Sequence, residues 1–216
     1  MTELRFTLVS DGSSDKALLP VLRWLLIANG VEIAINGNWA DLRLLPQPPR
    51  TLRGRVGAAL GMYPCELLFV HRDAERQPRE DRVQEIRKAV REAAAPNDEA
   101  PPAVCVVPVR MTEAWLLFDE PAIRYASSNP LGRVPLEVPR IDALEKLPDP
   151  KTLLHDLLQA ASGLTGRRLK KFSVSKAAAR ISERIDDFGP LRHLTAFTAL
   201  EDELRTVLRD LNLTAA

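Results

Sequence analysis

The stretch Leu4-Arg-Phe-Thr-Leu-Val-Ser10, followed directly by Asp11-Gly-Ser-Ser-Asp15, decides the class of fold to which this chain belongs. The first part is apolar, β-branched and aromatic, as in a strand, and the second part is a cluster of turn and N-cap formers. A helix is expected from about residue 14 to residue 28, where leucines recur at helical spacing, and Asn29-Gly30 should end it. Strand, tight turn and helix in this order predict an α/β protein.

The same alternation of strands and helices continues along the chain. Three further apolar runs predict strands at 31–35, 65–70 and 103–109, the first of them ending at Asn36-Gly37-Asn38. Helices are expected around 51–60, 81–95 and 111–119. Because parallel strands are joined by right-handed crossovers that usually contain a helix, this rhythm predicts a mostly parallel sheet flanked by helices.

The chain is expected to divide into three parts. Residues 1–120 carry the strand and helix alternation and should form the α/β domain. Residues 121–150 are rich in proline and predict an irregular connection, whereas 151–216 contain only helical patterns. We expect this C-terminal helical region to pack on the same domain.

The overall composition excludes a strongly basic protein. Of the 216 residues, 30 are Lys or Arg and 29 are Asp or Glu, so any contact with nucleic acid must come from a local cluster of cations. Cys65 and Cys105 have no C-x-x-C spacing and no neighbouring histidine, so they are expected to be buried thiols. No leader sequence or membrane-length apolar run is recognisable, which predicts a cytoplasmic protein without membrane contact.

Acidic residues follow three of the predicted strands. Asp11 and Asp15 come after the first strand, Asp73 and Glu75 after the strand at 65–70, and Glu113 after the strand at 103–109. Ligands of open parallel sheets bind beyond the carboxyl ends of the strands, and neighbouring strands lie close together there. Carboxylate oxygens suit Mg²⁺, so the sequence predicts a metal site at this edge.

Each acid also has a purely structural interpretation. Asp11 and Asp15 are typical turn and N-cap residues, and Asp73 and Glu75 could belong to a solvated loop. Glu113 could stand in the first turn of a helix, where a carboxylate suits the helix dipole. The joint occurrence of acids at three strand ends is what favours a site.

Three short segments carry a resemblance to a known superfamily. Asp11-Gly-Ser-Ser-Asp15, Asp73-Ala-Glu75 and Thr112-Glu-Ala-Trp-Leu-Leu117 resemble motifs of the Toprim-like proteins, which include topoisomerases, primases and overcoming-lysogenization-defect nucleases. The closer resemblance is to a branch of small Toprim-like proteins that are often encoded beside an ATPase gene. It extends to the segments at 149–151 and 194–204 and so covers most of the chain.

The resemblance implies a Mg²⁺- or Mn²⁺-dependent nuclease that acts on nucleic acid. It also implies a role as the effector of an ATPase-coupled anti-phage system. It implies Asp73 and Glu75 as metal ligands, and Asp11 as general acid or base or as a further ligand. Glu113 would complete the catalytic set, and Asp15 is a further candidate ligand. The implied partners are nucleic acid and an ATPase, and the protein could also form a homo-oligomer.

Two positions depart from the superfamily pattern. Asp11 stands where Glu is usual, and Glu75 stands where a second Asp is usual, so each carboxylate is displaced by about one methylene. Metal binding tolerates such changes better than catalysis does. A second hypothesis is therefore a catalytically silent Toprim-like module that binds a partner ATPase or nucleic acid.

A tract without acids lies between Asp156 and Glu183. Its cations include Arg167, Arg168, Lys170, Lys171 and Lys176, which are the candidate nucleic-acid-binding residues. Such a tract can bind the phosphate backbone, but it can equally be a solvated face. The smaller set of arginines at 50, 53 and 55 is interpreted as solubilising charge.

Two other motifs are excluded. His71-Arg72-Asp73 lacks the asparagine, the Gly-rich loop and the strand lysine of a protein kinase. Asp11-Gly-Ser-Ser-Asp15 lacks the Lys-Ser/Thr of a phosphate-binding P-loop. Neither a kinase nor a P-loop nucleotide site is therefore expected.

Overall fold

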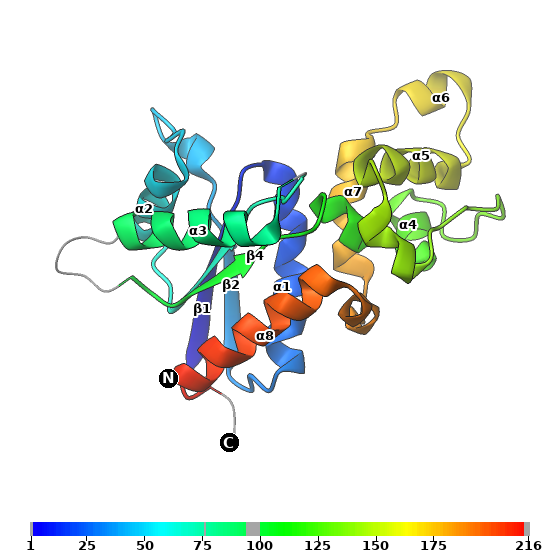
Figure 1. The fold of residues 1–216 in the computed structure, drawn as a ribbon. Helices are drawn as coiled ribbons and strands as arrows, with labels where there is room; N and C mark the ends of the chain where they lie inside the picture. Colours follow the sequence, from blue (N-terminus) through cyan, green and yellow to red (C-terminus); the bar gives the residue numbers. More distant parts are fainter. Residues whose placement is uncertain (1, 76, 94–99, 214–216) are drawn as a thin grey trace.

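A four-stranded parallel sheet forms the centre of the molecule (Figure 1). The structure is a computed structural model that describes residues 2–75, 77–93 and 100–213. The strands are β1 (Glu3–Val9), β2 (Ala34–Trp39), β3 (Leu67–His71) and β4 (Ala103–Val106), and every neighbouring pair in the order β2-β1-β3-β4 is parallel. The predicted α/β fold with a mostly parallel sheet is confirmed.

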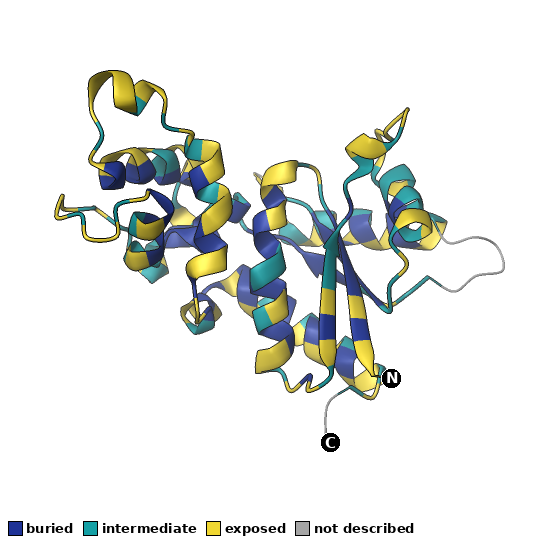
Figure 2. Cartoon of the chain, turned by 180° about the vertical axis from the view of Figure 1, so that it is seen from behind, coloured by how far each residue is buried: buried dark blue, intermediate teal, exposed yellow. Residues whose placement is uncertain are grey.

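Helices cover both faces of the sheet. Helices α1 (Leu18–Ala28) and α8 (Thr195–Asp210) pack on one face, and α2 (Leu52–Met62) and α3 (Arg79–Ala93) pack on the other. Side chains alternate between the two faces because successive strand residues point in opposite directions. In β3, Leu67 and Phe69 join the core under α1 and α8, whereas Leu68 and Val70 join the core under α2 and α3. Figure 2 shows how the buried residues concentrate between the layers.

The position of β2 differs from the prediction of a strand at 31–35. The strand begins at Ala34 and continues through Asn36-Gly37-Asn38, which were interpreted as its end. The reason is a close approach, because a Cβ atom on Gly37 would lie 2.2 Å from the ring of Phe6 on β1. Gly37 is therefore needed for packing and does not mark a turn. At the end of β2, Trp39 Nε1 donates a hydrogen bond of 2.9 Å to Ser10 Oγ.

Several other helices and strands begin or end at residues other than those predicted. The helix expected at 14–28 begins as a 3₁₀ helix, Ser13–Ala17, and the one expected at 111–119 is a 3₁₀ helix, Thr112–Leu116. Strand β4 ends at Val106 and not at 109, close to Pro108, which has no N–H to donate to a ladder. Strand β3 extends to His71, one residue beyond the expected end. The expected end of the helix at 81–95 lies outside the described residues.

The helical region lies beside the sheet (Figure 1). Helices α4 (Glu120–Ala126), α5 (Pro150–Ser162) and α7 (Val174–Ile181) pack against one another, and α6 (Gly166–Lys170) follows α5. The segment 121–150, predicted to be irregular, thus contains most of α4 and a 3₁₀ helix, Ile141–Lys146. Shorter 3₁₀ helices lie at Leu42–Leu44, Ser182–Arg184 and Gly189–His193. The C-terminal helical subdomain is confirmed.

The last helix returns from this region to the sheet. The carboxylate of Glu203 on α8 accepts a hydrogen bond of 3.3 Å from the backbone N–H of Cys105 on the edge strand β4. The same carboxylate lies 3.4 Å from Arg87 Nη2 and 3.9 Å from Arg79 Nη2 on α3. Glu203 thereby ties α8 to the edge of the sheet and to the helix on its other face. Within the described residues, no helix combines the length and the apolar character needed to cross a membrane.

Candidate functional site

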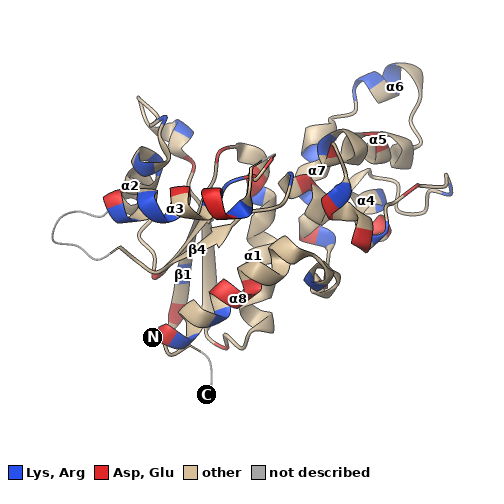
Figure 3. Cartoon of the chain, in the orientation of Figure 1, with Lys and Arg blue, Asp and Glu red and all other residues tan. Residues whose placement is uncertain are grey.

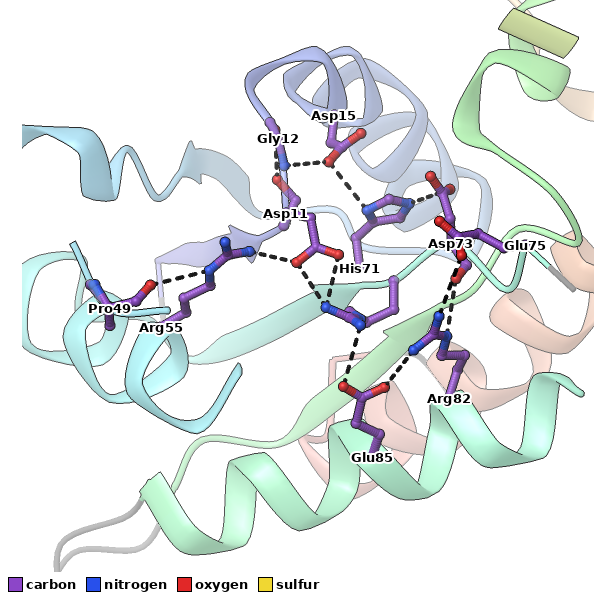
Figure 4. A network of polar contacts seen from close by, with 12 residues as sticks. Asp11, Gly12, Asp15, Pro49, Arg55, His71, Asp73, Glu75, Arg82 and Glu85 are labelled. Atoms are coloured by element: carbon purple, nitrogen blue, oxygen red, sulfur yellow. Dashed lines mark hydrogen bonds and ion pairs between the residues drawn. The ribbon is translucent and has the colours of Figure 1, made fainter. Parts of the chain in front are cut away.

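The carboxyl ends of β1 and β3 bring Asp11, Asp15 and Asp73 to the same edge of the sheet (Figure 4). The two strands are neighbours, and Val9 of β1 lies beside Val70 of β3. The residues that follow the two strands therefore begin at the same height along the sheet. The residues that follow join one network of hydrogen bonds and ion pairs. The sequence expectation that these acids gather at this edge therefore agrees with the geometry.

Two arginines hold Asp11. Its carboxylate forms an ion pair with Arg55 of α2, and Arg72 Nη1 lies 3.0 Å from Oδ1 and 2.9 Å from Oδ2. Arg72 also reaches Glu85 of α3 at 3.4 Å. The interpretation of Arg55 as solubilising charge was wrong, because its guanidinium pairs with Asp11 at the carboxyl end of β1. The negative charge of Asp11 is thus compensated by the protein itself.

His71 is buried between two carboxylates. Its side chain is 1% exposed, its Nδ1 lies 3.4 Å from Asp15 Oδ2, and its Nε2 lies 3.2 Å from Asp73 Oδ1. Burial alone would lower the pKa of this imidazole, but the contacts with Asp15 and Asp73 outweigh burial and raise its pKa from 6.5 to about 9. At neutral pH the ring is therefore an imidazolium, whose Nδ1 faces Asp15 in an ion pair and whose Nε2 is within hydrogen-bonding distance of Asp73.

Asp15 is the buried partner of this ion pair. Burial raises the pKa of its carboxyl, and the hydrogen bond and charge of His71 more than reverse this effect, so the pKa lies below its ordinary value. Asp15 Oδ2 also accepts a hydrogen bond of 3.0 Å from the N–H of Gly12. This bond closes the turn after β1. Asp15 thus fixes both the turn and the imidazolium.

The segment after β4 contacts both Asp73 and His71. The N–H of Thr112 donates to Asp73 Oδ1 at 3.1 Å, and Thr112 Oγ1 lies 2.9 Å from His71 Nε2. The next residue, Glu113, has a side chain that is 13% exposed and lies 3.6 Å from Lys151 Nζ of α5. The strand end of β4 therefore positions Asp73 through Thr112, while Glu113 pairs with the helical region.

Glu75 lies apart from the other acids. Its backbone is left-handed, with φ of 56°, and its side chain is 65% exposed. Its carboxylate lies 3.9 Å from Arg82 Nη2 of α3. Arg82 also donates to the backbone carbonyl of Asp73 at 3.1 Å and to Glu85 at 2.9 Å. Glu75 is thus directed toward α3 and does not converge with Asp11.

The predicted magnesium ligands do not form a metal site in this arrangement. Their carboxylates have the right donor chemistry, but within the described residues no three side chains of His, Cys, Asp or Glu come together as ligands. Asp11 is occupied by two arginines, and the imidazolium of His71 stands between Asp15 and Asp73. A divalent cation would have to displace these cations or use fewer protein ligands.

A cleft of about 500 Å³ runs between this edge and the helical region. Gly12, Ser14 and Thr112 line one wall, with Glu113 beside them, and Lys151, His155 and Lys176 line the other. Lys176 also lines a second pocket of about 620 Å³, which is formed by the helical region. The cleft and the pocket therefore share one wall residue.

The structure divides the basic tract into two groups. Arg168, Lys171 and Lys176 line the second pocket, whereas Arg167 and Lys170 are exposed and are not among its lining residues. Figure 3 shows the concentration of Lys and Arg on α6 and α7. The tract thus has an inner set of cations, Arg168, Lys171 and Lys176, which lines the pocket, and an outer set, Arg167 and Lys170, which does not.

No protein-family model, curated protein or solved structure matches this chain. The Toprim-like assignment therefore stays a prediction from short motifs. Sequence reasoning missed His71, Arg55, Arg72 and Thr112 as members of the network. A signal existed only for His71, which is a polar residue directly after the apolar run 67–70.

Proposed function

We propose that this protein is a Toprim-type nuclease that hydrolyses phosphodiester bonds of nucleic acid at the carboxyl edge of its sheet. One observation carries the proposal: the strand-end residues Gly12, Thr112 and Glu113 line a cleft whose opposite wall presents Lys151 and Lys176. Cations on one wall suit the phosphate backbone. On the other wall the carboxylate of Glu113, next to Thr112, which holds Asp73, suits the activation of water.

The residues at the edge have separable tasks in this proposal. Arg55 and Arg72 are oriented toward one point by Asp11, so a phosphate at that point would compete with Asp11 for both guanidinium groups. Asp11 would then be released as a carboxylate next to the bound phosphate. Asp73 is kept in one orientation by Thr112 and His71. Lys176 would hold the strand on the far wall of the cleft.

A divalent cation such as Mg²⁺ or Mn²⁺ would supply a bound water of lowered pKa and would stabilise charge on the phosphate. This requirement comes from the Toprim resemblance. Because the carboxylates as arranged do not form a metal site, no step is assigned to the ion. The anti-phage role and the ATPase partner likewise rest on the resemblance alone.

The second candidate is a catalytically silent module that binds nucleic acid or a partner ATPase. The ion pairs of Asp11 with Arg55 and Arg72 favour it, because they neutralise the residue that would act as base or ligand. In this case the edge is a structural network, and the lysines of the cleft retain a binding role.

A cleavage assay separates the two candidates. Plasmid, single-stranded DNA and RNA are incubated with the full chain in Mg²⁺, Mn²⁺ or EDTA. We expect cleavage in a divalent cation, and we expect Asp73→Asn to abolish it. Asp142→Asn is the matched control, because Asp142 is an exposed aspartate paired with Arg140. Binding without cleavage under every condition would support the silent module and refute the nuclease.

A thermal measurement tests the metal independently of activity. If the edge binds Mg²⁺, millimolar Mg²⁺ should raise the melting temperature. At a concentration ten times the dissociation constant, the free energy of unfolding should rise by about 1.4 kcal/mol. Asp73→Asn should remove this response, and Asp142→Asn should keep it. An identical rise in all three proteins would place the ion elsewhere.

A further inference from the structure

The second pocket, within the helical region, is strongly basic. It has a volume of about 620 Å³ and is lined by ten residues, of which four are cationic and none is acidic. The cations are Arg168, Lys171, Lys176 and Arg180. Like charges gathered in a hollow repel one another unless an anion is bound between them. The lining of the pocket therefore suits a negatively charged ligand.

The four cations are not used for internal ion pairs. Within residues 2–75, 77–93 and 100–213, none of them lies within 4.0 Å of a carboxylate. Arginines elsewhere behave differently: Arg55 and Arg72 pair with Asp11, and Arg192 pairs with Glu201. The pocket thus keeps its positive charge available.

The walls of the pocket are fixed by hydrogen bonds. Ser127 Oγ donates to the carbonyl of Leu158 at 3.0 Å, which joins the end of α4 to α5. Arg180 Nη2 donates to the carbonyl of Ala126 at 2.9 Å, so this guanidinium is held in one orientation. A preorganised cation loses less freedom when it binds an anion, which strengthens binding.

The remaining lining residues indicate what accompanies the anion. Phe172 is partly buried and lines the same pocket, together with Leu164. An aromatic ring beside cations suits a nucleobase joined to a phosphate, because every base offers a face for stacking. The volume also lies within the range of pockets that hold small ligands.

We propose that this pocket binds a nucleoside phosphate, with its phosphate among Arg168, Lys171, Lys176 and Arg180 and its base against Phe172. A phosphomonoester carries about two negative charges, which suits a pocket lined by four cations better than the single charge of a phosphodiester does. The ligand is either the phosphorylated end of a nucleic-acid strand or a free nucleotide. The first source rests on the proposed function: Lys176 lines both the pocket and the cleft, so a strand whose end is bound in the pocket would continue into the cleft.

A binding experiment with the full chain in EDTA tests the pocket without cleavage. The probes are a nucleoside, its 5′-monophosphate, and one oligonucleotide carrying a phosphate at its 5′ end, at its 3′ end or at neither. The test variant is Arg168→Ala with Lys171→Ala. The matched control is Arg167→Ala with Lys170→Ala, which removes the same charge from the outer set of the same tract. All four side chains are exposed, so both variants should keep the melting temperature of the parent.

We expect the test variant to lose affinity for phosphorylated probes by about tenfold or more, because two charge-assisted contacts disappear, and we expect the control to change it less than about twofold. A free monophosphate that binds as tightly as the oligonucleotides identifies a nucleotide site. A preference for one phosphorylated end identifies a strand-end site.

Two results overturn the proposal. Equal losses in the test variant and in the control mean that only the general charge of the tract matters. Equal binding of the nucleoside and its monophosphate means that the pocket does not recognise phosphate. Phosphate binding in a protein that never cleaves nucleic acid would refute the proposed nuclease and leave this site in place.

Discussion

Raising the pH from about 6 to about 9.5 should destabilise this protein through one buried residue, His71. Its imidazolium lies between Asp15 and Asp73, and its pKa is raised from 6.5 to about 9 in the folded state. In the unfolded chain the pKa returns to its ordinary value. The folded protein therefore binds this proton more tightly, and the stabilisation is fully present below about 6.5 and lost as the pH rises through about 9.

The size of this effect follows from the difference in pKa. At about 1.36 kcal/mol per pKa unit, a rise from 6.5 to about 9 corresponds to about 3 kcal/mol of unfolding free energy. Screening by solvent does not reduce this free energy, because the side chain of His71 is only 1% exposed. A loss of this size is large beside the total stability of a typical domain, which is about 5–15 kcal/mol.

Urea denaturation at constant ionic strength, repeated at several pH values, measures the effect. His71→Gln removes the titrating group and should flatten the profile between about pH 6.5 and 9, with a loss of about 3 kcal/mol already at low pH because the two carboxylates lose their cation. His193→Gln is the matched control, since His193 is exposed. It should leave the profile unchanged. If the profiles of the parent and of His71→Gln run parallel over this range, His71 is not protonated at neutral pH and the electrostatic account of the edge is wrong.

Two further predictions concern the packing of the sheet. Gly37→Ala should destabilise the protein by about 1–3 kcal/mol, because its Cβ would collide with the ring of Phe6, while Gly61→Ala in α2 meets no atom within 4 Å and should stabilise by up to about 1 kcal/mol in the same thermal melts. A loss at both positions would contradict the close approach of β1 and β2. Glu203→Ala should cost about 1–2 kcal/mol in urea denaturation, because it leaves the buried N–H of Cys105 without a partner. An unchanged stability would mean that water or another group satisfies this N–H.

The sequence was sufficient for the class of fold. Apolar runs bounded by turn residues located β1, β3 and β4 to within a few residues, because these strands are buried and their composition reflects it. β2 was displaced because Asn36-Gly37-Asn38 has the composition of a turn. Its extended backbone pairs with β1, and this tertiary contact is one that no local pattern records.

The candidate site was only partly predictable. The rule that ligands bind at the carboxyl ends of parallel strands located Asp11, Asp15 and Asp73 correctly at one edge. The partners of these acids were not predictable, because Arg55 meets Asp11 across 44 residues of chain. The charge state of His71 likewise depends on burial and on two neighbours, which only the folded chain brings together.

The charge balance of the edge network has a kinetic consequence. The network contains five carboxylates and four cations at neutral pH, so it carries a single net negative charge: Asp11, Asp15, Asp73, Glu75 and Glu85 against Arg55, His71, Arg72 and Arg82. A polyanion diffusing toward this edge would be neither accelerated nor held at a distance by so small a charge. If the protein binds a polyanion as proposed, long-range attraction would come instead from the acid-free tract on α6 and α7, where Lys and Arg are concentrated. The rate of encounter with a polyanion should therefore depend on salt through the helical region, while events at the edge of the sheet should be far less sensitive to ionic strength.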